Sequence, residues 1–289
     1  MAAAMSFLPN LRNLFFPPAS SQAKDRGSKR GASWFWMAVG VLYFVLPLVA
    51  TFDFSLRARK GVLSFLAYER VFKDPAFWKT FIFSLEMAFF TILVSLLLVV
   101  PTAYWIRLRL PKLRVIVEFI SMLPFVIPAI VLVFGFIRVF SGAPFFLTNT
   151  SFGTNVLLVA GYTVLALPYM FRAVDTGLAA IDVRSLTEAA QSLGAGWGTI
   201  LFKIIFPNLR VAILSGAFLT LATVIGEFTI ASFLVGINAF GPYMSLIGQN
   251  KTYESSSLAI ISFMLTWAFM GLLQFLNRGQ ASSSLAGAH

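Results

Sequence analysis

Long apolar runs alternate with short polar or charged segments along most of this chain. A run of about 20 apolar residues is long enough for a helix that crosses the hydrocarbon core of a membrane, which is roughly 30 Å thick. The runs extend over approximately 34–52, 80–106, 115–140, just after 151 to 172, 211–235 and 258–276. The pattern therefore predicts an all-α membrane protein with six transmembrane helices, which form one domain over residues 34–278.

The two ends of the chain lack such runs. Residues 1–33 combine prolines, serines and glycines with five Lys or Arg residues, a composition that cannot bury a core. We interpret them as a cytoplasmic N-terminal tail, and residues 279–289 as a disordered C-terminal tail. The run that begins at Trp34 has no convincing small-residue cleavage site and is long for a signal peptide, so we expect it to be retained as the first span.

A moderately polar stretch, residues 182–208, separates the fourth and fifth runs and contains the sequence EAAQSLGAGWGTILFKIIFP, which starts at Glu188. Its place between two spans puts it at a membrane surface. Ser185 and Glu188 have the spacing of a capping box, in which each side chain accepts a hydrogen bond from the backbone N–H of the other residue. This spacing predicts a short helix that begins at Ser185.

A second short helix should follow a bend. Gly194 can adopt the left-handed conformation that ends many helices. Gly196 and Gly198 allow a sharp change of direction before a helical stretch over 199–206, which Pro207 should close. We therefore expect a two-helix loop between spans four and five.

Composition supports the membrane interpretation and limits the partners. Of the 289 residues 58% are hydrophobic and 11% are charged, and the mean hydropathy is +0.85. Soluble proteins have about 45–50% apolar and about 25% charged residues. The net charge of +11 does not indicate nucleic acid, because the basic residues lie in tails and loops beside apolar runs, where they orient helices and contact anionic lipid.

The basic residues also predict the orientation of the spans. Four cations lie between the second and third runs: Arg107, Arg109, Lys112 and Arg114. With both termini in the cytoplasm, 14 of the 22 Lys and Arg residues lie on the cytoplasmic side, as the positive-inside rule requires. This N-in, C-in orientation places the two-helix loop in the cytoplasm.

Several kinds of chemistry are excluded. The chain has no cysteine, and its one histidine is His289 at the end. The glycines at 194–198 follow no predicted strand, and no Walker-type phosphate loop occurs elsewhere. We therefore predict no catalytic residues, no metal site and no cofactor on this chain.

Two acidic residues lie inside apolar runs, Glu86 in the second and Glu227 in the fifth, both toward the outer side. A charge at the bilayer centre costs at least about 2.5–3.5 kcal/mol, so such residues face a cavity, a partner charge or a substrate. We predict that both line a substrate pathway. Interfacial solvation of Glu86, and a buried hydrogen bond or ion pair of Glu227, are the alternatives.

Other residues of the apolar runs suggest packing or motion. Small and polar residues of the fifth run recur at spacings of three or four, which places Thr220, Thr223 and Glu227 on one helix face and makes both threonines pathway candidates. Pro124 and Pro128 in the third run predict kinks, which bend the helix or act as a hinge.

The loop resembles a known motif. Permeases of ABC importers have an EAA loop with the pattern Glu-Ala-Ala, three residues, Gly, nine residues, Ile, one residue, Leu-Pro. The residues that match at these spacings are Glu188, Ala189, Ala190, Gly194, Ile204 and Pro207. Phe206 departs from the pattern, because the family usually has Leu there. In that family the loop docks into a groove on a cytoplasmic ATPase subunit, so the resemblance implies that these residues couple ATP hydrolysis to transport.

The resemblance extends over residues 65–276, whose segment order is similar to that of polyamine, phosphonate and ferric-iron permeases. The sequence Gly226-Glu227-Phe228 resembles a GEF element of several of these proteins, and the chain looks closest to spermidine/putrescine permeases. The implied function is uptake of polyamines across a prokaryotic cytoplasmic (inner) membrane. Phosphonate, ferric iron or another small solute are alternative substrates.

The resemblance also implies partners: two cytoplasmic ATPase subunits that hold ATP and Mg, a second permease subunit, and an extracellular or periplasmic substrate-binding protein. The second permease is either a related chain or another copy of this one. A rival of another class is an ion-coupled secondary transporter, in which the intramembrane acids would carry protons.

Overall fold

The structure is a computed structural model that describes residues 19–59 and 61–286. This part of the chain is helical, and no β-strand occurs in it, which confirms the all-α prediction. The chain divides into two units, Met1–Phe54 and Ser55–His289. The first unit consists of most of α2 (Ala19–Ser55), in which Trp34 and Trp36 are exposed. Helix α2 begins inside the stretch that we expected to be a tail, and residues 1–18 lie outside the described residues.

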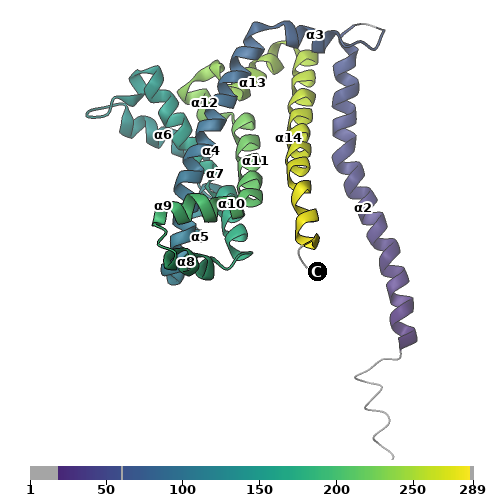
Figure 1. The fold of residues 1–289 in the computed structure, drawn as a ribbon. Helices are drawn as coiled ribbons and strands as arrows, with labels where there is room; N and C mark the ends of the chain where they lie inside the picture. Colours follow the sequence, from purple (N-terminus) through teal and green to yellow (C-terminus); the bar gives the residue numbers. More distant parts are fainter. Residues whose placement is uncertain (1–18, 60, 287–289) are drawn as a thin grey trace, which may run out of the picture. The chain divides into compact units, whose positions relative to one another are not determined.

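Three helices form the centre of the second unit. Helices α4 (Pro75–Arg109), α7 (Ser151–Ala179) and α11 (Arg210–Gly226) lie side by side (Figure 1). Small residues allow them to approach closely. A Cβ atom on Gly177 of α7 would lie 2.5 Å from the Cβ atom of Ala212 on α11. The runs at 80–106 and after 151 thus form unbroken helices, and α7 continues seven residues past the expected end near Arg172.

The run at 115–140 is not one helix. It begins in α5 (Arg114–Met122), passes through the 3-10 turn η3 (Leu123–Phe125) and ends in α6 (Ala129–Phe140). The two halves meet at 96°. The prolines predicted to kink this run explain the break, because Pro128 adopts an extended conformation with ψ 138° and interrupts the helical hydrogen bonds.

The run at 211–235 is also broken, so the prediction of one continuous helix was wrong. Helix α11 ends at Gly226, Glu227 is extended with ψ 127°, and a separate helix, α12 (Thr229–Leu234), follows. Thr220 and Thr223 therefore lie on one helix while Glu227 lies beyond its end. The predicted face therefore holds for the two threonines, and only Glu227 lies outside it.

The remaining elements surround this centre. Helix α3 (Leu66–Lys73) precedes α4, and the short turns η1 (Leu56–Ala58), η2 (Pro111–Leu113), η4 (Leu147–Asn149) and η6 (Gly236–Asn238) join longer helices. Helix α13 (Phe240–Asn250) was not expected from the sequence. Helix α14 (Thr252–Ala286) contains the run at 258–276 and continues into the stretch that we expected to be a disordered tail.

The described residues support a membrane protein with several crossings. Three helices are long and apolar enough to cross a membrane, namely Ser33–Ala58, Pro75–Arg109 and Ser151–Ala179. Two bent pairs of helices raise this number to five if each pair is counted as one span. Six crossings and the N-in, C-in orientation stay predictions.

Candidate functional site

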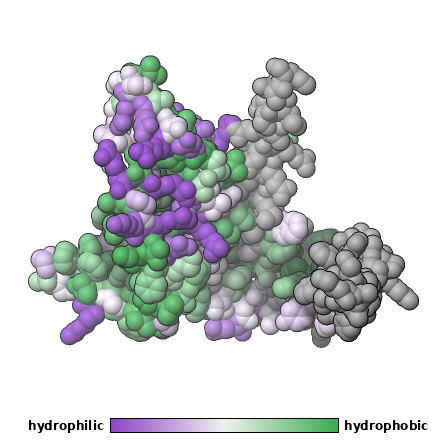
Figure 2. All heavy atoms as spheres, turned by 90° about the horizontal axis from the view of Figure 1, so that it is seen from below, coloured by the Kyte–Doolittle hydropathy of each residue, from purple (hydrophilic) through white to green (hydrophobic). Residues whose placement is uncertain are grey.

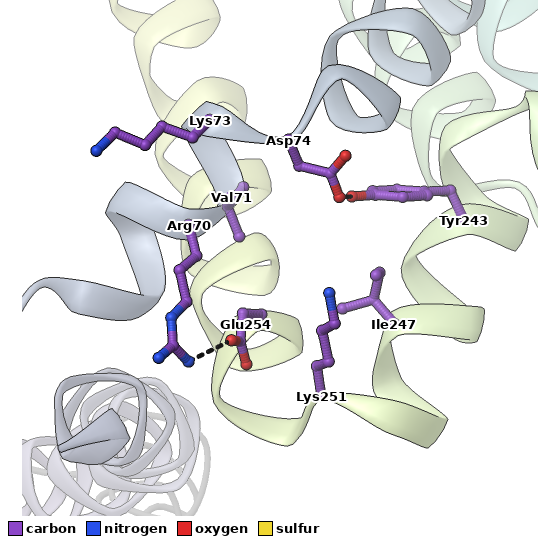
Figure 3. A pocket seen from close by; sticks show the side chains of 8 residues that line it. All are labelled: Arg70, Val71, Lys73, Asp74, Tyr243, Ile247, Lys251 and Glu254. Carbon is purple, nitrogen blue, oxygen red and sulfur yellow. Dashed lines mark hydrogen bonds and ion pairs between the residues drawn. The ribbon is translucent and has the colours of Figure 1, made fainter.

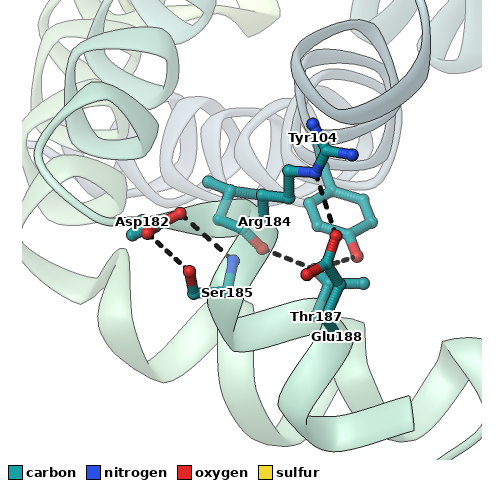
Figure 4. Close-up of polar contacts among 7 residues, drawn as sticks. Tyr104, Asp182, Arg184, Ser185, Thr187 and Glu188 are labelled. Carbon is teal, nitrogen blue, oxygen red and sulfur yellow. Dashed lines mark hydrogen bonds and ion pairs between the residues drawn. The ribbon is translucent and has the colours of Figure 1, made fainter.

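The two-helix loop lies at one end of the second unit, where α8 (Val183–Ser192) and α9 (Trp197–Thr199) lie at the lower end of α4 in Figure 1. Its first helix, α8 (Val183–Ser192), begins before Ser185, so the predicted capping box does not form. Asp182 is the N-cap instead. Its Oδ1 accepts a hydrogen bond from the backbone N–H of Ser185 at 3.1 Å, and its Oδ2 accepts one from the Ser185 hydroxyl at 2.6 Å (Figure 4).

The carboxylate of Asp182 outcompetes Ser185 as a cap because it is charged and faces the positive end of the helix dipole. The hydrogen bonds from the Ser185 hydroxyl and backbone N–H hold the pKa of the Asp182 carboxyl below its ordinary value. Ser185 then lies in the first turn of α8, where its N–H is already satisfied. Sequence analysis missed Asp182, although an Asp three residues before Ser185 is a recognisable cap signal.

Glu188 is therefore free of a capping role and lies on the surface. Its Oε1 accepts a hydrogen bond from Nε of Arg184, one helical turn earlier, at 2.9 Å. The Glu188 side chain is 63% exposed, and an exposed pair of this kind contributes only about 0.3–0.5 kcal/mol to helix stability. Ala189 beside it is exposed, whereas Ala190 is buried against the rest of the unit.

The end of α8 confirms the role predicted for Gly194. This glycine has φ +78°, in the left-handed region. Its N–H donates to the carbonyl of Gln191, and the N–H of Ala195 donates to the carbonyl of Ala190, which together form a Schellman motif. The turn leaves Leu193 exposed over 88% of its surface.

The second helical stretch is longer than predicted, because it starts at Trp197 and ends at Asn208. It consists of α9 (Trp197–Thr199), the π-helical turn η5 (Ile200–Ile205) and α10 (Phe206–Asn208). Gly198 lies inside it and does not bend the chain. Pro207 does not close it either, because the helical stretch continues through Asn208.

Apolar contacts hold the loop against α4 and α7. One cluster of buried side chains contains Val183, Ala190, Ile200, Ile205 and Leu209 from the loop region, Val99, Val100, Ala103 and Tyr104 from α4, and Met170, Phe171, Val174 and Leu178 from α7. Burial of one such aliphatic side chain contributes about 1.5–3 kcal/mol at most. Ile204 is half-buried against the same cluster. The loop is therefore packed into the body of the unit.

The outward side of the loop has a different character. Leu193 and Phe202 are exposed, at 88% and 58%, near the exposed charges of Glu188 and Lys203. Figure 2, seen from this end of the molecule, shows hydrophilic side chains gathered together with hydrophobic ones beside them. Apolar anchors among polar groups are typical of a surface that binds another protein.

An ion cluster fixes the helix ends beside the loop. The Asp175 carboxylate of α7 accepts hydrogen bonds from Arg107 of α4 at 2.7 Å and from Arg114 of α5 at 2.8 Å. These three residues join three helices at one point. Arg114 also lies one turn from Glu118, but no ion pair between these two residues occurs in the described part of the chain.

Glu227, predicted to line the pathway, caps a helix. Its Oε1 accepts a hydrogen bond from the N–H of Ile230 at 2.9 Å, and its Oε2 accepts one from the N–H of Ala231 at 3.1 Å. The break before α12 leaves these first-turn N–H groups without helical partners, and the carboxylate satisfies them. The hydroxyls of Thr220 and Thr223 donate within α11, and Thr220 is fully buried.

Glu86 lies apart from Glu227. It is exposed and lines a cavity of about 540 Å³ between α4, α7 and the end of α12. Lys79, two turns earlier on α4, and the amide of Asn155 on α7 line the same cavity. The structure therefore brings Glu86 to a cavity that Glu227 does not line.

Arg172 is a cavity residue that sequence analysis assigned to a helix end. Because α7 continues to Ala179, Arg172 lies inside the helix and lines a mainly apolar cavity of about 720 Å³ with residues such as Phe125 and Val211. Its position within an apolar run is the sequence feature from which a place at a cavity could have been predicted.

A further cavity, of about 410 Å³, lies between α3, α13 and α14 (Figure 3). Ion pairing and hydrogen bonding tie these helices together. Arg70 pairs with Glu254 at 3.0 Å, and the Tyr243 hydroxyl donates to Asp74 at 2.9 Å.

Comparison with known proteins identifies the family. Residues 100–281 match the family described as "Binding-protein-dependent transport system inner membrane component". The spermidine/putrescine transport system permease protein PotC of Haemophilus influenzae is 29% identical over 255 residues, which cover 84% of this chain and 95% of that protein. PotB of the same system in Escherichia coli is 25% identical and covers 68% of this chain and 77% of that protein.

Relatives with other substrates also match. The methionine import system permease protein MetP of Bacillus subtilis is 30% identical over 54% of this chain and 65% of that protein. Among solved structures, a bacterial ABC transporter that imports the acidic polysaccharide alginate has a chain with a TM-score of 0.68 and 12% identity, which covers 91% of this chain and 99% of that one. This likeness shows a shared fold.

Proposed function

Because the chain belongs to the family of inner membrane components of binding-protein-dependent transport systems, we propose that it forms half of the substrate pathway of an ABC importer. In this proposal its loop couples ATP hydrolysis by partner subunits to movement of the pathway. The family is a transport component and not an enzyme. The observation on which the proposal depends most is the loop itself, which is packed into the unit on one side and presents exposed apolar and charged residues on the other.

The coupling residues would act in two groups. Glu188, Ala189, Gly194 and Pro207 lie on the exposed side, where a partner subunit can reach them. Ala190 and Ile204 face the apolar cluster that joins the loop to α4 and α7. A force applied to the exposed side would therefore reach the long helices through close-packed side chains.

Helix α4 provides a direct route to the pathway. It is continuous from the loop end, at Tyr104, to the cavity lined by Glu86. The rise of an α-helix puts these two residues about 27 Å apart along one rod. We propose that displacement of the loop tilts α4 and changes access to this cavity, with Glu86 on the pathway and Glu227 and the two threonines of α11 beside it.

We propose polyamines as the substrate, because the PotC and PotB relatives belong to spermidine/putrescine systems. The exposed carboxylate of Glu86 suits an ammonium group, and an inside-negative potential favours entry of each positive charge by about 2.3 kcal/mol per 100 mV. Phosphonate, ferric iron or another small solute would use the same machinery. The family match disfavours the rival ion-coupled transporter.

The proposal includes the partners and topology inferred from the sequence. These are two cytoplasmic ATPase subunits that bind ATP and Mg, a second permease subunit, a periplasmic binding protein, and six spans with both termini inside. The test is co-purification with the ATPase and uptake of labelled putrescine by vesicles. Gly194→Pro should abolish both, because proline cannot adopt φ +78°. Gly196→Ala is the control, since Gly196 has φ −75° and open space around it.

Full uptake by Gly194→Pro would contradict the coupling role of the loop. Uptake of methionine or iron in place of putrescine would show that the substrate is not a polyamine, and it would leave the coupling role of the loop intact. Glu86→Gln should lower putrescine uptake about tenfold if Glu86 binds the cation on the pathway.

A further inference from the structure

Two consecutive residues at the end of α4 contact both helical parts of the loop. Tyr104 is 2% exposed, and its Oη lies 2.8 Å from the Oγ1 of Thr187 on α8 (Figure 4). The Thr187 hydroxyl donates to the carbonyl of Val183 at 2.6 Å, so the hydroxyl of Tyr104 is the donor toward Thr187. This buried hydrogen bond joins α4 to the first helix of the loop.

Trp105 makes the second contact. Its ring centroid lies 4.8 Å from that of Trp197, the first residue of α9, at an interplanar angle of 38°. Arg109, one turn further along α4, places its guanidinium 5.8 Å from the Trp197 ring. The Trp197 ring thus contacts another ring and a cation, both from α4, and each contact favours a defined orientation.

Helix geometry explains how neighbours reach two different helices. Successive residues of an α-helix point about 100° apart around its axis. Tyr104 therefore faces α8 within the buried cluster, and Trp105 faces Trp197 of α9 and is 41% exposed. The two helices of the loop are separated only by the turn at Gly194, Ala195 and Gly196, so contacts that hold both of them prevent rotation about this turn.

We propose that Tyr104 and Trp105 are positioning residues that make α4 and the two-helix loop move as one body. Apolar packing alone permits helices to slide past one another, whereas a buried hydrogen bond and a contact between two tilted rings fix the orientation of the loop on α4. This inference rests on the proposed function of the loop in coupling. It adds that the contacts of Tyr104 with Thr187 and of Trp105 with Trp197 are needed for the loop and α4 to move together.

The first test measures amide hydrogen exchange of the purified chain, which requires no partner subunit. The double variant Tyr104→Phe/Trp105→Leu removes both contacts and keeps apolar side chains in place. Exchange of the amides in 183–208 should rise about tenfold, while exchange of α7 stays unchanged. The control is Trp267→Leu on α14, an exposed tryptophan far along the chain that should change neither region. Unchanged exchange in the loop would overturn the proposal whether or not an ATPase binds.

The second test measures uptake and ATP hydrolysis together in the assembled transporter. The double variant should hydrolyse ATP at nearly the wild-type rate, while uptake per ATP falls about tenfold. The single variant Trp105→Phe keeps Tyr104 and an aromatic ring against Trp197. Its uptake per ATP should return to within about twofold of the wild-type value. A ratio that stays at the wild-type value, or that Trp105→Phe fails to restore, would overturn the proposal. Failure of the wild-type chain to bind any ATPase would instead contradict the proposed function.

Discussion

Two glutamates of this chain differ in how they contact the backbone, and neither makes the contacts that its sequence position predicts. Glu188 at the start of the loop fits a capping box, yet it lies 63% exposed and pairs with Arg184. Glu227 reads as an isolated acid in an apolar run, yet it accepts two backbone hydrogen bonds at the start of α12. A side chain caps a helix when its acceptor atoms face the free N–H groups of the first turn. The position of these N–H groups depends on where the helix begins.

The comparison separates the two regions by function. At the loop, Asp182 caps α8 and leaves the carboxylate of Glu188 available on the surface. At the break between α11 and α12, Glu227 is occupied by the backbone, and Glu86 is the acid that faces a cavity. We therefore expect changes at Glu227 to affect folding and changes at Glu188 to affect partner binding.

The largest effect on stability should come from a change at the break between α11 and α12. A Cβ atom on Gly241 of α13 would lie 2.2 Å from the carbonyl oxygen of Glu227, so Gly241→Val must displace the backbone of the break. Such overpacking costs about 1–3 kcal/mol or more, and we expect strongly reduced yield and thermal stability in detergent. Gly142→Ala, with open space around it, should behave as wild type. A Gly241→Val protein of normal stability would show that this contact does not support the break.

Glu227→Ala should have the second largest effect. The free energy of unfolding should fall by about 0.5–2 kcal/mol, because two N–H groups of α12 lose their acceptor. Glu227→Gln retains one acceptor oxygen and should recover much of the stability and uptake. Thermal unfolding and putrescine uptake measure both. If Gln is as harmful to uptake as Ala while stability is normal, the charge of Glu227 acts on the substrate and the capping account is wrong.

Asp182 gives a pH-dependent effect. Its pKa is lower in the folded chain than in the unfolded one, so the cap contributes fully above the unfolded value of about 3.9 and is lost as pH falls through the folded pKa. Near neutral pH the cap should be intact. The stability difference between wild type and Asp182→Ala, followed by thermal unfolding, should shrink below about pH 4. A difference that is constant across this range would contradict the capping role.

Glu188→Gln should have the smallest effect on stability, at about 0.3–0.5 kcal/mol. Any larger fall in transport must then come from contact with a partner. Arg184→Gln breaks the same ion pair and is the matched control. Equal loss of transport in both variants would indicate that the pair, and not the Glu188 carboxylate alone, matters.

Part of this architecture could be predicted from the sequence. The apolar runs located α4 and α7, because length and hydrophobicity report directly on membrane-spanning helices. Gly194 was identified correctly as a left-handed cap, since few other residues tolerate φ +78°. The match of six residues at fixed spacing located the loop.

The breaks could not be predicted in the same way. Lipid and protein neighbours both favour apolar residues, so the run at 211–235 carries no signal for the break at Glu227. In the run at 115–140 the prolines predicted a kink, but not the 96° angle between its two halves. Pro101 and Pro168 lie inside continuous helices, whereas Pro128 starts a new one, and packing decides between these outcomes. Asp182 and Ser185 are both possible caps of α8. Which of them caps the helix depends on the backbone conformation where the helix begins, and the sequence does not show this.

The most direct test of the central claim uses the absence of cysteine from the chain. Leu193→Cys places a single thiol at a loop position that is exposed over 88%, and Ile237→Cys, exposed over 60% near the cavity of Glu86, is the control. A membrane-impermeant maleimide should label Leu193→Cys only from the cytoplasmic side, and bound ATPase should protect it while Ile237→Cys stays reactive. Labelling of Leu193→Cys from outside, or equal reactivity with and without the ATPase, would contradict the account.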